Sequence, residues 1–270
     1  MKINDVLSSP NYNSSYNIIL NSFIREYDIS KANINVLFER GVIDKSTYDN
    51  LYNSDKFIRE KTIGLMIRKD NQIYKEIQAG IMDAKYKLIQ SNNIDLEDIV
   101  SIKNDAVFVM NNKLQNTKFG LIDFKLKNTY TLFLKIPKYE FYYYYNTYTK
   151  EEKLDIKGIN DSKLEIHKNY FIDFLLALFN TLQLSGIIEG VNMIQYFSEL
   201  YINRKLNIGY YRTFDSNSKF DIIGDGNYAW SVPSISNPER IIDLDIRYNY
   251  EIIRDIYGVL ISLYFKKVKE

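Results

Sequence analysis

The chain has 270 residues, and its 35 Lys and Arg almost balance 34 Asp and Glu, for a formal net charge of +1. A chain of this length can bury a substantial core in one large domain or two small ones. The balanced charge excludes a global attraction to polyanions, so any nucleic-acid contact must rest on local patches. The absence of cysteine excludes disulfides, thiolate zinc sites and cysteine nucleophiles.

Histidine chemistry and membrane insertion are both disfavoured. The single histidine, His167, cannot build a His-rich metal site, and its setting at the start of an amphipathic segment indicates a structural or exposed role. The N-terminus lacks the apolar core of a signal peptide. The most apolar segment, 170–188, carries Asp173, Asn180 and Gln183, which favours a buried helix over a membrane span. We therefore expect no membrane partner and a cytoplasmic protein, in the host cytoplasm if the source is viral.

The first third of the chain predicts an arm, a strand and several helices. Residues 1–20 are polar and rich in Asn and Ser, which is typical of a flexible arm. The segment 21–29 predicts a strand, and a helix follows with Ser30 as N-cap and Gly41 as its stop. Residues 44–93 are helical overall, beginning at Asp44 or Ser46. Apolar residues line one face of the last helix, namely Ile73, Ile77, Ile81, Ala84 and Leu88.

The pattern then changes to strands and back to helices. Residues 98–149 are β-branched and aromatic and predict four antiparallel strands, with turns at 110–116, at 126–129 and around Pro137. The later segments predict helices at about 168–184, 187–206 and 248–267, with strands and a tight turn at "GDGN" before the last of them. We predict the α+β class: one domain over 21–270 containing an antiparallel sheet, a helical insertion before it and a mostly helical part at 165–267.

Two carboxylates stand where a metal site would need them. Asp28 closes the first predicted strand and runs into a helix, in "EYDISKANINVL". Asp105 lies inside a β-patterned segment, "DIVSIKNDAVFVM". Carboxylates on neighbouring strands are a recurrent way to hold Mg²⁺, and two such ions stabilise the attacking and leaving oxygens in nucleotidyl transfer. If the two strands pair, the acids become neighbours.

These segments resemble the palm domain of nucleic-acid polymerases. Asp28-Ile29-Ser30 is similar to the Asp-x-Ser of the first palm motif of family A polymerases, and "VSIKNDAVFVM" is similar to the third motif. Between them, "KFIREKTIGLMIRK" is similar to the fingers helix whose cations hold the incoming triphosphate. The third motif departs from the family, with Asn104-Asp105-Ala106 in place of His-Asp-Glu.

The resemblance covers 22–135 as a palm-like part and implies metal-dependent nucleotidyl transfer on nucleic acid. It implies Asp28 and Asp105 as catalytic residues and Mg²⁺ ligands, with Arg59 or Lys61 on the phosphates of a nucleoside triphosphate. The residues also allow plainer roles. Asp28 could cap the helix near Ser30, Asp105 could be a turn acid or an edge-strand charge, and the two cations could form a solvated helix face.

A tyrosine-rich tract, "YEFYYYYNTY" at 139–148, suggests a second site. Aromatic side chains next to lysines can form a platform on which single-stranded bases stack. On this interpretation Tyr142, Tyr144, Lys138 and Arg212 contact nucleic acid. The alternative is a two-sided strand, in which alternate tyrosines pack inward and the others form a cross-strand ladder.

Three functions follow from these observations. The first is a compact magnesium-dependent nucleotidyltransferase, or polymerase-like protein, that acts on nucleic acid. The second is a non-catalytic phage accessory or structural protein that binds a protein partner through exposed tyrosines, a residue type enriched at interface hot spots. The third is a single-strand nucleic-acid binder without catalysis. The geometry of Asp28 and Asp105 discriminates the first from the second.

Overall fold

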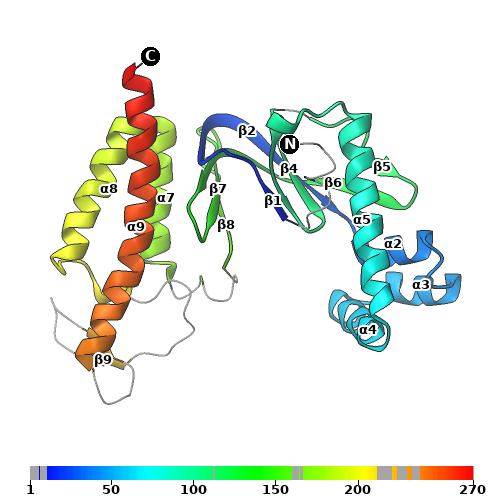
Figure 1. The fold of residues 1–270 in the computed structure, drawn as a ribbon. Helices are drawn as coiled ribbons and strands as arrows, with labels where there is room; N and C mark the ends of the chain where they lie inside the picture. The colour runs from blue at the N-terminus through cyan, green and yellow to red at the C-terminus, as the bar shows by residue number, and fades with distance from the viewer. Residues whose placement is uncertain are drawn as a thin grey trace. The chain divides into compact units, whose positions relative to one another are not determined.

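The structure, a computed structural model, describes residues 6, 11–111, 113–159, 164, 167–211, 221–223, 230–232 and 238–269. Figure 1 shows the order and labels of the helices and strands. The helices are α2 (Ala32–Glu39), α3 (Lys45–Asn53), α4 (Lys56–Lys69), α5 (Asn71–Ser91), α7 (Phe171–Leu184), α8 (Ile187–Ile202) and α9 (Pro238–Lys269). The strands are β1 (Asn11–Asn13), β2 (Ile18–Ile29), β3 (Ile99–Lys103), β4 (Ala106–Met110), β5 (Lys118–Phe119), β6 (Ile122–Lys135), β7 (Glu140–Tyr145), β8 (Glu152–Lys157), β9 (Asp221–Ile223) and β10 (Trp230–Val232).

The larger sheet follows the strand order β1-β3-β4-β2-β6-β7-β8, and β5 pairs with β6 outside this order. β9 and β10 form a separate antiparallel pair. β3 and β4 form an antiparallel hairpin, and β7 pairs antiparallel with both β6 and β8. The predicted α+β class is therefore confirmed, with an antiparallel sheet over 98–136, helices before it and a helical C-terminal part.

The chain divides into two compact units, whereas the sequence predicts a single domain over 21–270. Unit 1 comprises Met1–Tyr16 and Phe23–Thr129, and unit 2 comprises Asn17–Ser22 and Tyr130–Glu270. β2 and β6 each contribute residues to both units. Because the chain passes between the units inside strands, the sequence shows no Gly-, Pro- or Ser-rich linker at the division.

Two local predictions differ from the structure. The expected arm at 1–20 contains β1, which pairs with β3, and the first residues of β2. The expected turn at 126–129 lies inside β6, which runs unbroken from Ile122 to Lys135. The polar residues of this segment do not form a turn. Two of them, Lys127 and Asn128, contact acids on β2 instead.

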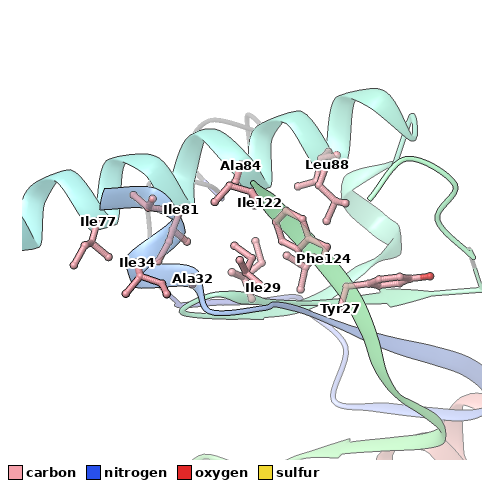
Figure 2. Close-up of a cluster of buried hydrophobic side chains, with 14 of the residues drawn as sticks. Tyr27, Ile29, Ala32, Ile34, Ile77, Ile81, Ala84, Leu88, Ile122 and Phe124 are labelled. Carbon is pink, nitrogen blue, oxygen red and sulfur yellow. The ribbon is translucent and has the colours of Figure 1, made fainter. Parts of the chain in front are cut away.

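The core of unit 1 lies between α5 and the sheet. Figure 2 shows side chains of α5 that point toward side chains of β2 and β6. Strand residues alternate between the two faces of a sheet, so Tyr27 and Ile29 of β2 face α5. Of the predicted α5 stripe, Ile73 is partly buried at the edge of this cluster and the rest are buried, namely Ile77, Ile81, Ala84 and Leu88. The predicted amphipathic helix is confirmed.

The N-terminal ends of the helices show where the preferences of capping residues predict the structure. The Asp44 carboxylate accepts a hydrogen bond from the Thr47 amide at 2.7 Å, which confirms Asp44 as the cap of α3. Asp55 caps α4 in the same way. The predicted Ser30 cap is wrong, because α2 starts after Lys31, which has φ 52° and makes no side-chain cap hydrogen bond. Asp28 therefore does not cap this helix.

The core of unit 2 combines aliphatic side chains with many aromatic rings. In Figure 1, α7, α8 and α9 run beside one another. The Phe174 and Phe197 rings of α7 and α8 stack with centroids 3.5 Å apart. Phe179 packs its ring against Phe141 and Tyr143 of β7, at 5.5 and 5.8 Å. Within the described residues, no helix is long and apolar enough to cross a membrane.

Two helical glycines offer a matched test of this packing. A methyl group at Gly80 of α5 would lie 2.3 Å from Cγ1 of the buried, β-branched Val36, whereas one at Gly64 of α4 would meet no atom within 4 Å. Alanine favours a helix interior over glycine by about 1 kcal/mol, but overpacking a core costs about 1–3 kcal/mol. We expect Gly64→Ala to raise the free energy of unfolding and Gly80→Ala to lower it, in urea titrations. A stabilising Gly80→Ala would contradict the α2–α5 packing.

Candidate functional site

Strand pairing brings Asp28 and Asp105 to the same end of unit 1. β2 and β4 are antiparallel neighbours, and Asp28 lies opposite Ala106. Asp105 precedes Ala106 in the turn between β3 and β4, and its carbonyl accepts a hydrogen bond from the Ile29 amide at 3.3 Å. The two acids, which lie far apart in the sequence, are therefore neighbours across adjacent strands.

Lys127 of β6 lies near both carboxylates of β2. Its ammonium lies 3.1 Å from the Asp28 carboxylate and 3.9 Å from that of Glu26. Glu26 is only 1% exposed, and its carboxylate accepts a hydrogen bond from the Asn128 amide at 2.5 Å. Glu26 and Asp28 are two residues apart in β2 and thus share a face of the sheet, opposite the one that Tyr27 contributes to the core.

Asp105 sits in a less favourable environment for a charge. Burial raises the pKa of Asp105 above its ordinary value, and repulsion from Asp28 raises it further, while Lys127 acts in the opposite direction. Lys85 of α5 is 2% exposed, and burial lowers its pKa, an effect that attraction to Asp105 partly offsets. The site is thus a cluster of three acids and two lysines, and we name Glu26, Asp28, Asp105, Lys85 and Lys127 the acid–lysine cluster.

The chemistry open to this cluster depends on Lys127. A divalent cation needs oxygen ligands, and the Asp28 carboxylate that would supply one is paired with the Lys127 ammonium. A bound cation would have to displace that ammonium. Among the described residues, no group of three or more Asp, Glu, His or Cys side chains gathers in a way that could hold a metal ion. The described geometry fits an ionic cluster with structural lysines more directly than a metal site.

The two predicted phosphate-binding cations have different environments in the structure. Arg59 is buried, and its guanidinium donates a hydrogen bond to the Ser54 carbonyl at 3.2 Å, so the fold of α4 holds it. Lys61 is exposed, with its ammonium 6.0 Å from the centre of the Phe57 ring. The plainer prediction of a solvated helix face therefore fits Lys61 but not Arg59.

The tyrosine tract forms a strand with two packed sides. Tyr142 is 0% exposed, and its ring lies 5.3 Å from that of Tyr130 and 5.0 Å from that of Phe133. A ring buried in this way offers no face for a base. Tyr144 is half-buried and its hydroxyl accepts a hydrogen bond from Asn146.

Of the other residues of the predicted nucleic-acid surface, only Lys138 lies among the described residues. Lys138 is exposed in the turn before β7. Arg212 and the "GDGN" segment lie outside the described residues. The structure thus describes no continuous row of exposed tyrosines and lysines along β7, and the two-sided strand is the arrangement that the tract adopts.

Sequence reasoning missed three members of the cluster, although two of them left a signal. Lys85 interrupts the apolar stripe of α5, one turn after Ile81, and a charge in such a stripe indicates a buried ionic contact. Glu26 is two residues before Asp28, the spacing that places both on one face of a strand. Lys127 carries no such signal, because 126–129 reads as a turn.

Comparison with known proteins places most of the chain in one family. The family model described as "Bacteriophage PBS1 gene 130 protein" matches residues 3–261. The chain belongs to this family. The match extends over both units, whereas the polymerase resemblance concerns short motifs within 22–135, and the family description supports the phage source that the sequence suggested. No curated protein matches the chain.

The raised pKa of Asp105 gives the gene 130 family protein a testable pH dependence. Because the folded state binds this proton more tightly than the unfolded state, ionising Asp105 costs stability as pH rises through the folded pKa. Asp105→Asn removes that cost. At pH 7 the variant should be more stable than wild type, by on the order of 0.5 kcal/mol. The gain should vanish below the ordinary carboxyl value of 3.8, where Asp105 is protonated in both states.

Urea titrations at several pH values measure this difference. Asp95→Asn is the matched control, since it removes the same charge from an exposed position. A variant less stable than wild type at pH 7, or a gain that persists in acid, would show that the Asp105 carboxylate stabilises the cluster instead.

Proposed function

We propose that this protein is a non-catalytic phage accessory protein that acts by binding other proteins. The observation that carries the proposal is the exposure of large apolar side chains along two helices. Phe57 of α4 is 75% exposed and Tyr196 of α8 is 64% exposed, and each has other exposed apolar residues on its helix. Single exposed apolar residues are normal, but grouped ones indicate an interaction surface.

The acid–lysine cluster supports the same proposal. The carboxylates that the sequence nominates for chemistry contact or face lysines of the same chain. An ion pair that joins β2 to β6 has a structural role whether or not a ligand is present. Membership in a phage protein family agrees with an accessory protein encoded for use during infection.

Photo-crosslinking during infection tests this function. We expect benzoylphenylalanine in place of Phe57 or Tyr196 to form covalent adducts with protein, because both positions lie on the proposed surfaces. The same group in place of Lys87, an exposed residue of α5, is the control and should form few adducts. Mass spectrometry identifies the adducts. Adducts at Phe57 and Tyr196 no more frequent than at Lys87, or adducts with nucleic acid alone, would refute protein binding through these helices.

A second candidate is a metal-dependent nucleotidyltransferase that acts on nucleic acid. The specific observation in its favour is that Asp28 and Asp105 are neighbours and that their repulsion helps to raise the Asp105 pKa. Mg²⁺ bound by both carboxylates would relieve this repulsion. In this candidate the exposed Lys61 contacts the phosphates of a nucleoside triphosphate, and the ammonium of Lys127 moves aside.

Thermal unfolding with and without Mn²⁺ or Mg²⁺ tests the second candidate. A ligand at 100 times its Kd stabilises the native state by about 2.7 kcal/mol. The candidate requires a rise in Tm that Asp28→Asn and Asp105→Asn each abolish, together with incorporation of labelled nucleotide that both variants lose. A Tm that is unchanged by either cation in wild type excludes the proposed metal pair. The accessory function predicts this unchanged Tm.

A further inference from the structure

We propose that the outward face of α4 in one copy of the protein binds the outward face of α8 in a second copy. The proposal rests on the proposed protein-binding function and names the partner. Two helical faces carry it: the α4 face, made of Phe57, Ile58, Lys61, Leu65 and Arg68, and the α8 face, made of Ile188, Tyr196, Glu199 and Ile202. Both faces are exposed and carry opposite charge.

The α4 face combines apolar side chains with cations. Phe57, Ile58 and Leu65 are exposed, and Lys61 and Arg68 lie between them at helical spacing. The whole helix, KFIREKTIGLMIRK, has five Lys and Arg against a single Glu. Gly64 adjoins this face, and open space surrounds its α-carbon where a side chain would project. A second helix can therefore approach the backbone closely at this point.

The α8 face combines apolar side chains with acids. Ile188 and Ile202 are each 53% exposed, Tyr196 lies between them, and Glu199 occupies the same side of the helix. The exposed Glu189 adjoins Ile188 in the first turn. The helix IIEGVNMIQYFSELYI contains two Glu and no Lys or Arg. Its opposite side is already used, since the position of a Gly190 side chain would lie 2.3 Å from Leu182 of α7. The outward side is thus the one that a partner can reach.

Both faces extend over at least two helical turns. Ile58 and Leu65 are two turns apart, and Ile188 and Ile202 are four turns apart, so the α8 face is longer than the apolar part of the α4 face. Side-chain ridges of one helix can pack into the grooves of a second helix. When they do, the cations Lys61 and Arg68 come near the acids of α8. Charge complementarity of this kind selects the partner and its register.

Nucleic acid fits the α4 face less well than a helix does. Base stacking needs aromatic rings, and two of the three apolar residues on this face, Ile58 and Leu65, are aliphatic. An aliphatic-and-basic helix face is instead suited to an aliphatic-and-acidic one. Because each copy presents one face of each kind, the contact is heterologous, so repeated contacts produce a ring or an open chain of copies.

Charge reversal with mixing tests the pairing in the full-length protein. Sedimentation velocity of wild type should show association that increases with concentration and weakens with salt. Lys61→Glu with Arg68→Glu makes both faces acidic, and Glu189→Lys with Glu199→Lys makes both basic. Each variant alone should raise the Kd by about tenfold or more, because like charges then oppose each other. An equimolar mixture of the two variants should recover association, since every contact is again complementary.

The control variant is Lys75→Glu with Lys87→Glu, which makes the same charge change on exposed positions of α5 and should associate as wild type does. Circular dichroism melts verify that every variant folds. A wild type that stays monomeric at all concentrations, or a mixture that fails to associate, overturns this inference. If crosslinks from Phe57 then lead to a different protein, the protein-binding function stands and only the choice of partner falls.

Discussion

The contact between β2 and β6 in unit 1 is the interaction on which much of this fold depends. Lys127 and Asn128 hold the acids Asp28 and Glu26, and this allows a polar segment with the sequence of a turn to continue as a strand. The opposite side of β2 carries Tyr27 into the core under α5. One strand therefore serves a charged surface and an apolar core at once, because successive side chains point to opposite faces.

This contact also determines how the carboxylates should be understood. Removing Lys127 would leave Glu26 buried with less compensating charge, and an uncompensated buried charge is strongly destabilising. Asp105 and Lys85 are less well compensated, since burial shifts the pKa of each toward its neutral form. The cluster thus contains one well-compensated part and one strained part. A strained acid near another acid is typical of functional sites as well as of structural networks, which is why the metal-dependent candidate deserves its own experiment.

The binding proposals depend on exposed apolar side chains rather than on the acid–lysine cluster. Helices α4 and α8 each bury one side within their own unit. The buried residues include Ile63 and Arg59 in α4, and Ile194 and Phe197 in α8. Their outward sides still carry large apolar residues, whose exposure to water a protein partner would relieve. The family match spans both units, so both helices lie within the matched region.

Part of this structure could be predicted from the sequence alone, because it depends on local chemistry. Asp44 caps α3, the stripe from Ile77 to Leu88 buries one side of α5, and the β-branched run at 98–136 forms antiparallel strands, because caps and periodicity act between residues close in the chain. The neighbouring positions of Asp28 and Asp105 also followed, once their strands paired. Only tertiary structure decided that Tyr142 is buried, that Lys31 rather than Ser30 occupies the N-cap position of α2, and that Lys127 lies against Asp28. These outcomes depend on which distant strands and helices meet, and the periodicity of a segment determines its own faces but not its partners.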